Sequence, residues 1–323
     1  MDVPCVRVRP TAGEGTRREL AALDLIADEY EITVEDGWLY IPVVAEPEGY
    51  DVVAHDVPPR EGQTLPDDIL GFAPRYERLG DIAILEEDSA ERAREIADAL
   101  VASDLPVESV VNRASKVKGD IRVRDWDVLA GSTRTVHREY GFEYELDLAR
   151  VYFSPRLATE RHRVVEQVEA GERAFDMFAG VGPFAIPFAA RGAEVVGTDL
   201  NEVAIDYLRR NAARNGVSDR VTAIAGDVRE VEGYDDWADR VVMNLPHSAC
   251  EFLDAAVALA GDDCTLHYYD IQHEEDPFGP GERAIREAAG SDYEVAVETR
   301  REVRSYAPHE LNVCLDVRLT RRR

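Results

Sequence analysis

The stretch Phe175-Asp-Met-Phe-Ala-Gly-Val-Gly-Pro-Phe-Ala185 decides the fold of this chain. A short apolar run breaks into two closely spaced glycines and then resumes with helical spacing, a pattern typical of a strand, a tight turn and a helix. Gly180 and Gly182 carry no Cβ, so the backbone can turn sharply and let a flat, bulky ligand lie against it. The stretch therefore predicts a strand-turn-helix unit of an open α/β sheet.

Three polar residues follow later predicted strands. Asp199, Asp227 and Asn244 each come directly after, or close, a short apolar run. In a doubly wound sheet the carboxyl ends of parallel strands face one crevice, so these residues and Gly180 should line a single site. Asp199 also stands where such folds place a carboxylate that accepts hydrogen bonds from ribose hydroxyls. Together these residues predict a site for a nucleoside cofactor.

The end of the chain predicts how this sheet closes. A helix is expected over Val203–Asn215, with Asn201 as its N-terminal cap and Gly216 as its stop. The last strands are expected at 265–270, 293–304 and 311–319, and the final two have no helix between them, which implies an antiparallel edge. The predicted fold class is α/β: a Rossmann-like, mostly parallel, doubly wound sheet with an antiparallel C-terminal edge, preceded by two smaller α+β modules.

Periodicity and composition divide the chain into modules. The first is a small α+β unit with a strand Val3–Val8, a helix Gly15–Ile26 and a hairpin turn at Glu35-Asp-Gly37. A stretch rich in proline and acidic residues follows it, without periodicity, and reads as an extended linker. The expected boundaries are 1–44 for the first module, 45–68 for the linker, 69–149 for an α+β middle module and 150–323 for the large α/β module.

Bulk composition excludes several protein classes. The chain has 323 residues and 45% hydrophobic content, enough for two or three domains, and no apolar run approaches a membrane span. The N-terminal Met-Asp-Val-Pro-Cys shows no basic segment followed by an apolar one, so we expect neither a signal peptide nor an anchor, and a cytoplasmic location. The four cysteines lack Cys-x-x-Cys spacing, which argues against a zinc site or a disulfide framework and predicts buried small hydrophobes.

The formal charge of −28 would ordinarily oppose an RNA partner. Lysine occurs only at Lys116 and Lys118, whereas arginine is abundant, and this composition resembles proteins from salt-accumulating, halophilic cytosols. At molar salt the Debye length falls to about 3 Å, so local arginine clusters rather than global charge decide binding. Composition therefore does not exclude RNA as a binding partner.

Basic residues gather in the middle module. A solvated face and a phosphate-facing surface are about equally supported by such a run, since the only two lysines of an acidic chain lie in it. The residues of this basic span are Arg113, Lys116, Lys118, Arg122, Arg124, Arg134 and Arg138.

The glycine turn suits a cofactor without phosphates. Pro183 removes an N–H donor that a pyrophosphate would use at the helix start. The form Asp-x-Phe-x-Gly-x-Gly over 176–182 resembles the first motif of Rossmann-like, class I methyltransferases that use S-adenosyl-L-methionine. The resemblance implies that Asp199 holds the ribose and Asp227 the adenine edge. The residues that it implies for cofactor binding are Phe178, Gly180, Gly182, Asp199, Leu200, Asp227, Val228 and Asn244.

Asn244-Leu-Pro-His247 resembles the Asn-Pro-Pro-aromatic element of enzymes that methylate ring nitrogens. An asparagine carbonyl can accept a hydrogen bond from a proton-bearing nitrogen of a flat base, and a rigid Leu-Pro turn holds the backbone close to the base face. His247 departs from the aromatic position of that element. An Asn-containing turn without such a role is the plainer interpretation.

A longer series of motifs is similar to the archaeal and eukaryotic tRNA (guanine-37-N1)-methyltransferase family. The likeness runs from about residue 69 to the end, and the small first module with its linker resembles the extra domain of the archaeal three-domain form. The motifs are Thr133-Arg-Thr-Val-His-Arg-Glu-Tyr-Gly141, Tyr152-Phe-Ser-Pro-Arg-Leu157, Glu160-Arg161, the glycine stretch, Asn244-Leu-Pro246, His267-Tyr-Tyr269 and Ser305-Tyr-Ala-Pro308.

This resemblance implies methyl transfer to N1 of guanosine 37 in the anticodon stem-loop of tRNA. It implies catalytic roles for Arg156, Asn244 and Pro246, and RNA contacts for Tyr306 and Pro308. The basic span adds Arg113, Lys116, Lys118, Arg134 and Arg138 as expected RNA contacts. No membrane, no protein partner and no metal is implied.

Methylation of guanine N1 requires two kinds of group in the site. Guanine N1 carries a proton at neutral pH, so a base must remove it and a donor must stabilise the charge that arrives at O6. Arg156 is suited to donate to O6, and a salt bridge to Glu160 is its alternative. The candidates for the base are Asp199, Asp227 and Glu160, among which the sequence does not choose.

Three other functions stay open at this point. The nearest is transfer of the aminocarboxypropyl group to the tricyclic wybutosine precursor at the same tRNA position, where the same cofactor is attacked at another carbon. The others are a nicotinamide-dependent oxidoreductase and a non-catalytic RNA-binding protein with a relict fold. Asn244-Leu-Pro246 favours methyl transfer over the first of these.

Overall fold

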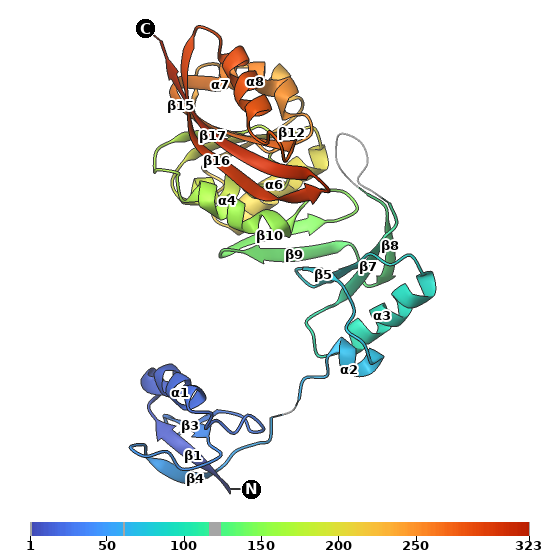
Figure 1. The fold of residues 1–323 in the computed structure, drawn as a ribbon, viewed down its shortest axis with the longest axis vertical. Coiled ribbons are helices and arrows are strands. Elements are labelled where there is room, and N and C mark those ends of the chain that lie inside the picture. Colours follow the sequence, from blue (N-terminus) through green and yellow to red (C-terminus); the bar gives the residue numbers. More distant parts are fainter. Residues whose placement is uncertain (1, 61, 116–123, 323) are drawn as a thin grey trace. The chain divides into compact units, whose positions relative to one another are not determined.

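The computed structural model describes residues 2–60, 62–115 and 124–322. The chain forms two compact units, Met1–Leu65 and Pro66–Arg323 (Figure 1). In the described parts of the chain, no helix is both long enough and apolar enough to cross a membrane.

The N-terminal unit is an antiparallel sheet of four described strands, ordered β2-β3-β1-β4, with the helix α1 (Gly13–Ala22) packed against it. Val6, Leu20 and Ile41 are fully buried at its centre. The predicted hairpin turn is confirmed: Asp36 and Gly37 both have positive φ, 49° and 76°, as a tight hairpin requires. The strands are β1 (Asp2–Val8), β2 (Thr33–Glu35), β3 (Trp38–Pro42) and β4 (Val52–Asp56).

Two expectations for this region are corrected. The stretch 45–68 is not an extended linker throughout, because β4 lies in it and pairs antiparallel with β1, Val52 opposite Val6. Backbone hydrogen bonds to β1 hold this segment as a strand, although its sequence shows no apolar periodicity. The predicted helix Gly15–Ile26 ends earlier, at Ala22, and Asp24 has a left-handed φ of 57°.

The middle module is an α+β layer at the start of the second unit. Strands β5 and β6 are antiparallel, β6 and β7 parallel, and β7 and β8 antiparallel. The Ser89 hydroxyl accepts a hydrogen bond from the Arg92 N–H and caps α3. The elements are α2 (Pro66–Leu70), β5 (Glu77–Leu79), β6 (Ile82–Leu85), α3 (Ala90–Ala102), β7 (Ser109–Arg113) and β8 (Trp126–Ala130).

A two-stranded hairpin joins the middle and C-terminal modules. It consists of β9 (Arg134–Glu139) and β10 (Phe142–Asp147), turned at Tyr140 and Gly141. Tyr144 and Leu146 of β10 lie in the same apolar core as the C-terminal helices. The side chain of Asn211 on α6 (Glu202–Arg214) accepts from the Glu145 N–H at 2.8 Å and donates to its carbonyl at 3.0 Å, as a neighbouring strand would. The hairpin therefore packs on the C-terminal module, although it precedes the predicted boundary at 150.

The C-terminal module is a seven-stranded sheet ordered β13-β12-β11-β14-β15-β17-β16. The first five strands are parallel, and β17 pairs antiparallel with both β15 and β16, which confirms the predicted edge. The strands are β11 (Arg173–Asp176), β12 (Glu194–Asp199), β13 (Val221–Ala225), β14 (Ala238–Met243), β15 (Ala260–His273), β16 (Tyr293–Ala307) and β17 (Glu310–Arg321).

Helices cover both faces of this sheet (Figure 1). One core contains residues of α4 (Ala158–Val165), α5 (Ala185–Ala190) and α6, and the other contains α7 (Leu253–Leu259) and α8 (Gly279–Ala289). The predicted Asn201 cap of α6 is confirmed, since its side chain accepts from the Val203 N–H at 3.1 Å. Because β11, β12, β13 and β14 are parallel, their carboxyl ends share one rim.

Gly182 is required by packing, and its replacement gives a test of the fold. At φ 96°, a Cβ on Gly182 would lie 2.5 Å from Leu208 Cδ1 and 2.9 Å from Ile186 Cδ1. We expect Gly182→Ala to lower the free energy of unfolding by roughly 1–3 kcal/mol through overpacking, beyond a backbone cost of about 1–2 kcal/mol, as measured by urea denaturation.

Gly171→Ala is the matched control, because Gly171 has a similar φ of 91° and no atom within 4 Å of its would-be Cβ. It should show the backbone cost alone. Equal losses in the two variants would contradict the tight packing inferred at Gly182.

Candidate active site

The glycine turn is fixed to the next strand through Asp199. The Gly180 N–H donates to Asp199 Oδ2 at 2.8 Å, and the Asn201 N–H donates to Oδ1 at 2.9 Å. Burial raises the pKa of Asp199, against the two backbone donors, which lower it. A carboxylate has about four acceptor positions, so Asp199 can still accept hydrogen bonds from ribose hydroxyls. The predicted meeting of Gly180 and Asp199 on one rim is observed.

The space above Gly180 is open. Its would-be Cβ finds as its nearest neighbour the carbonyl oxygen of Tyr152, 4.0 Å away, and Gly180 has a φ of 52°. The Asn201 side chain donates to the Arg150 carbonyl at 2.7 Å, so the segment 150–152 passes close to both the turn and the end of β12. This cradle fits a flat group laid on the backbone.

Asp176 is a candidate site residue that was not among the residues predicted from the sequence. It ends β11, is 1% exposed, and its Oδ2 has no hydrogen-bond partner among the described residues. Burial raises the pKa of Asp176 to about 7, with a smaller contribution from Asp199. A buried polar atom without a partner fits a polar ligand that supplies one. The available signal was an acidic residue at the end of the strand before the glycine turn.

The remaining predicted cofactor residues lie on the same rim of the sheet or close to it. Asp227 accepts from Arg229 Nε at 2.9 Å, and this partner lowers the pKa of Asp227. An adenine contact at Asp227 would therefore share the carboxylate with Arg229. Val228 is buried, Leu200 is half exposed, and Phe178 packs edge-to-face on Phe252 with ring centroids 5.0 Å apart.

The Asn244-Leu-Pro-His247 turn follows β14 directly. The Pro246 carbonyl accepts from the Ile271 N–H at 3.2 Å, which ties the turn to β15. His247 Nε2 lies 2.9 Å from the Tyr306 hydroxyl, and the two rings meet edge-to-face. The turn and the Ser305–Pro308 motif, far apart in sequence, are thus neighbours. His247 holds a predicted RNA-contact residue, a role that the sequence did not reveal.

Arg156 does not pair with Glu160, and that alternative is wrong. Its Nε and Nη2 donate to the two oxygens of Glu77, at 3.1 and 2.8 Å. Glu160 is instead buried among other donors: Arg163, the Tyr269 hydroxyl and Arg301. A guanidinium has five N–H donors, so the pair with Glu77 leaves three of them for another acceptor.

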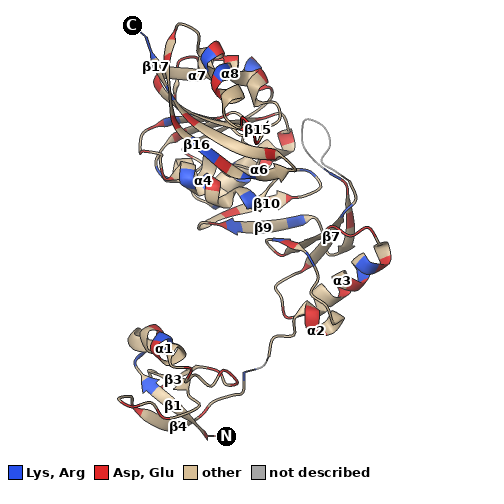
Figure 2. Ribbon diagram, viewed as in Figure 1, with Lys and Arg blue, Asp and Glu red and all other residues tan. Residues whose placement is uncertain are grey.

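The predicted RNA-contact residues differ in how they present their charge. Arg113 is 18% exposed and paired with Glu77 and Glu86, so little of its charge faces solvent. Arg134 and Arg138 on β9 are 73% and 80% exposed, each with one carboxylate partner. Pro308 is exposed beside Tyr306, whereas Lys116 and Lys118 lie outside the described residues. Figure 2 shows basic residues along β9 within an otherwise strongly acidic chain.

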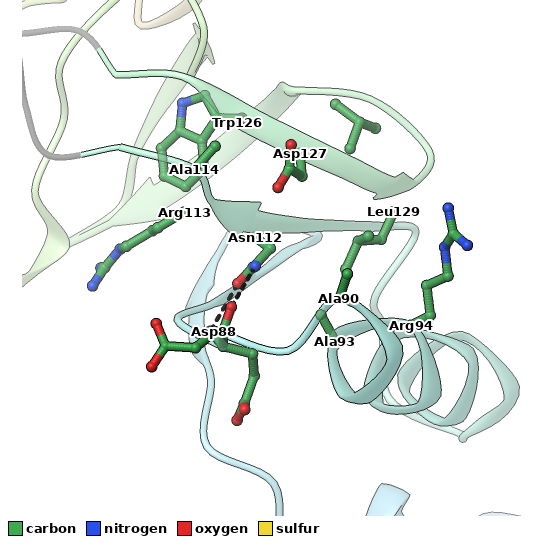
Figure 3. Close-up of a pocket in the computed structure, with 12 residues that line it drawn as sticks. Asp88, Ala90, Ala93, Arg94, Asn112, Arg113, Ala114, Trp126, Asp127 and Leu129 are labelled. Carbon is green, nitrogen blue, oxygen red and sulfur yellow. Dashed lines mark hydrogen bonds between the residues drawn. The ribbon is translucent and has the colours of Figure 1, made fainter.

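A pocket of about 670 Å³ opens in the middle module, apart from the glycine turn. It lies between the start of α3 and strands β7 and β8, with Arg94 and Arg113 at opposite ends (Figure 3). The Asn112 amide, buried at its base, is bonded on both sides to the Glu87 backbone. Its lining carries carboxylates as well as arginines, so it is no simple phosphate site.

A buried charged cluster contacts α4 through Arg163. His267, Cys314 and Asp316 could geometrically hold a metal ion, but Asp316 accepts from Arg163, and Arg240 lies 2.7 Å from His267. Two guanidinium groups oppose a cation there. Burial opposes ionisation of Asp316, yet His267 and Arg163 hold its pKa well below the usual range.

Of the four cysteines, Cys250 is exposed, so the expectation of burial is wrong for that one.

The fold and this rim define a Rossmann-like methyltransferase, and comparisons with known families agree. Residues 135–297 match the TRM5/TYW2 methyltransferase domain. Residues 5–51 match the tRNA methyltransferase 5 N-terminal domain, and residues 62–135 match the TYW2 N-terminal domain. The chain belongs to the TRM5/TYW2 methyltransferase family, which confirms the resemblance seen in its motifs.

Relatives of known activity span most of the chain. The tRNA (guanine(37)-N(1))-methyltransferase Trm5b of Pyrococcus abyssi is 40% identical, over 98% of each chain. The tRNA(Phe) (4-demethylwyosine(37)-C(7)) aminocarboxypropyltransferase of Pyrococcus horikoshii is 32% identical over 79% of this chain and 93% of its own.

Solved structures are similar over the same length. The complex of aTrm5 and tRNALeu has a TM-score of 0.71 and 31% identity, covering 98% of this chain and 99% of its own. Methanocaldococcus jannaschii Trm5 in complex with adenosine has a TM-score of 0.67 and 29% identity, covering 99% and 100%.

We expect Asp176 to make cofactor affinity depend on pH. S-adenosylmethionine carries a net positive charge and favours the ionised carboxylate, whereas burial keeps Asp176 largely protonated below its pKa of about 7. Binding should therefore release a proton, and affinity should rise roughly tenfold from pH 6 to pH 8 and level off. Calorimetric titration across this range measures it.

Asp176→Asn is the control, because the cofactor's own amine titrates equally in both proteins. The variant should bind more weakly and lose the part of the pH dependence that wild type adds. Parallel pH profiles in the two proteins would rule out a role for Asp176.

Proposed function

We propose that this chain transfers the methyl group of S-adenosylmethionine to N1 of guanosine 37 in the anticodon loop of tRNA. The observation that carries the proposal is its 40% identity, over 98% of each chain, to an enzyme of that name. The Asn244 turn stands on the same sheet as the glycine turn, which supports the same chemistry. The target base leaves the loop stack to enter the crevice, as base-modifying enzymes require.

The residues around the glycine turn fit a phosphate-free nucleoside. Asp199 would bind the ribose, the open backbone at Gly180 would face a flat group, and Asp176 would meet a cationic one. When bound, S-adenosylmethionine supplies an electrophilic methyl carbon. Phe178, Gly182, Leu200, Asp227, Val228 and Asn244 complete the proposed cofactor set.

Arg156 and Asn244 handle the base in this proposal. The Asn244 amide orients the guanine edge, with Pro246 keeping the turn rigid, and the N–H groups of Arg156 that Glu77 does not use donate to O6. A carboxylate takes the N1 proton, with Asp199, Asp227 and Glu160 as candidates. Stabilising the charge on O6 lowers the barrier, because that charge develops only as the proton leaves.

RNA binding rests on exposed cations and on the family's architecture. Arg134 and Arg138 on β9, with Tyr306 and Pro308 near the Asn244 turn, are proposed contacts, and the N-terminal unit is a proposed tRNA-binding module. Arg113 contributes less, given its carboxylate partners. We place the reaction in the cytoplasm, where unmodified tRNA is available.

Aminocarboxypropyl transfer is the second candidate, since the middle module matches the TYW2 N-terminal domain and a relative carries out that reaction. The match of residues 5–51 to the tRNA methyltransferase 5 N-terminal domain favours methyl transfer. Membership of a methyltransferase family removes the nicotinamide-dependent alternative.

Two labelled cofactors separate these candidates. The chain is incubated with a tRNA transcript and S-adenosylmethionine labelled either on the methyl group or on the aminocarboxypropyl carbons. Methyl label alone should reach RNA, and a transcript with adenosine at position 37 should stay unlabelled. Transfer of the aminocarboxypropyl label, or of neither label, would contradict the proposal.

Removing Arg156 tests the charge stabilisation at O6. We expect Arg156→Ala to lower the single-turnover rate constant roughly 10²–10³-fold, as loss of one well-placed donor does. Arg156→Lys should recover only part of this rate, since an ammonium lacks the planar fork. Rapid-quench methylation assays measure both. An unchanged rate, with S-adenosylhomocysteine affinity also unchanged, would show that Arg156 has no part in catalysis.

A further inference from the structure

One carboxylate of the middle module holds two arginines. Glu77, on β5, accepts from Arg156 Nε and Nη2 in a two-pronged pair and from Arg113 Nη2 at 2.8 Å. The nearest nitrogens of both arginines lie 2.8 Å from the same oxygen, Oε2. Arg113 has a second partner in Glu86, at 2.7 Å. Glu77 thus links Arg156 to the middle module, although the two residues are 79 positions apart in the sequence.

The segment that carries Arg156 also runs past the cofactor crevice. Arg156 stands in a 3₁₀ turn, Pro155–Leu157, only four residues after Tyr152, whose carbonyl is the nearest neighbour of the Gly180 cradle. The same turn leads directly into α4, which begins at Ala158. Glu77 therefore contacts a side chain whose segment passes the glycine turn at Tyr152, although Glu77 itself belongs to the middle sheet.

The geometry determines orientation as well as position. A two-pronged arginine–carboxylate pair fixes the plane of the guanidinium, which a single hydrogen bond does not. The side chain of Glu77 is 21% exposed, so solvent screens the pair less than it would on an open surface. Without the negative charge, two neighbouring guanidinium groups would repel each other, and Arg156, the more exposed of the two, is free to move away.

We propose that Glu77 is a positioning residue for methyl transfer: it holds Arg156 at the angle from which its other N–H groups reach the base. The inference rests on the proposed function of Arg156. It means that the C-terminal module does not complete its active site alone, because the middle module supplies the group that aims the arginine. A simple tether between the modules would use the same ion pair, but breaking it would lower the thermal midpoint rather than slow methyl transfer in the folded protein.

The experiment is a double-mutant cycle with a matched control. The variants are Glu77→Gln, Arg156→Ala, the double variant, and Glu86→Gln, which removes a carboxylate from Arg113 but not from Arg156. Single-turnover methylation of a transcript with guanosine 37 is measured at saturating tRNA and cofactor. Thermal midpoints and S-adenosylhomocysteine affinity are recorded for each variant.

We expect Glu77→Gln to slow methyl transfer about tenfold or more, because small misplacements of a catalytic group cost that much. Glu86→Gln should stay within about twofold of wild type. In the Arg156→Ala background, Glu77→Gln should add less than a twofold loss, because its effect passes through Arg156. S-adenosylhomocysteine affinity should not change.

Two results would overturn the inference. Glu77→Gln could leave the rate unchanged, or its loss could multiply with that of Arg156→Ala, which would show that Glu77 does not act through Arg156. If wild type itself placed no methyl group on guanosine 37, the proposed function would fail first. A wild type that methylates, with Glu77→Gln equally fast, would reject only the positioning role.

Discussion

The carboxylate of Asp199 holds the active site together. It accepts the Gly180 N–H with one oxygen and the Asn201 N–H with the other, so the turn after β11 and the start of α6 are fixed to the end of β12. Packing reinforces this bond, because Gly182 leaves no room for a side chain beside Leu208 and Ile186. The open cradle at Gly180 and the isolated oxygen of Asp176 exist because the turn is held in this shape. A loose turn would present neither.

Charge in this acidic chain is balanced locally, which decides where RNA can bind. Buried and partly buried arginines are paired with carboxylates, as in the pairs of Arg161 with Glu139 and of Arg163 with Glu160 and Asp316. Arg113 is committed in the same way, and only exposed arginines such as those of β9 keep charge for phosphates. The shared use of Glu77 by Arg113 and Arg156 shows that the same ion pairs that neutralise these arginines also join the modules.

The sequence predicted what depends on short-range pattern. The glycine turn, the rim residues after parallel strands, the Asn201 cap and the antiparallel edge all follow from local spacing, and the structure has each of them. The pair of Arg156 with Glu77, the contact of His247 with Tyr306 and strand β4 depend on residues distant in sequence, so no local pattern reveals them. Asp176 stood inside a quoted motif, yet its isolation became visible only with the surrounding core in place.

The central claim is that the crevice held by Asp199 is a nucleoside site without a place for pyrophosphate. Calorimetric titration of S-adenosylhomocysteine and of NADH into wild type and Asp199→Asn tests it most directly, with circular dichroism to verify folding. The account predicts one S-adenosylhomocysteine site in wild type, strongly weakened in the folded variant, and no binding of NADH. Tight NADH binding, or S-adenosylhomocysteine affinity equal in the two proteins, would contradict it.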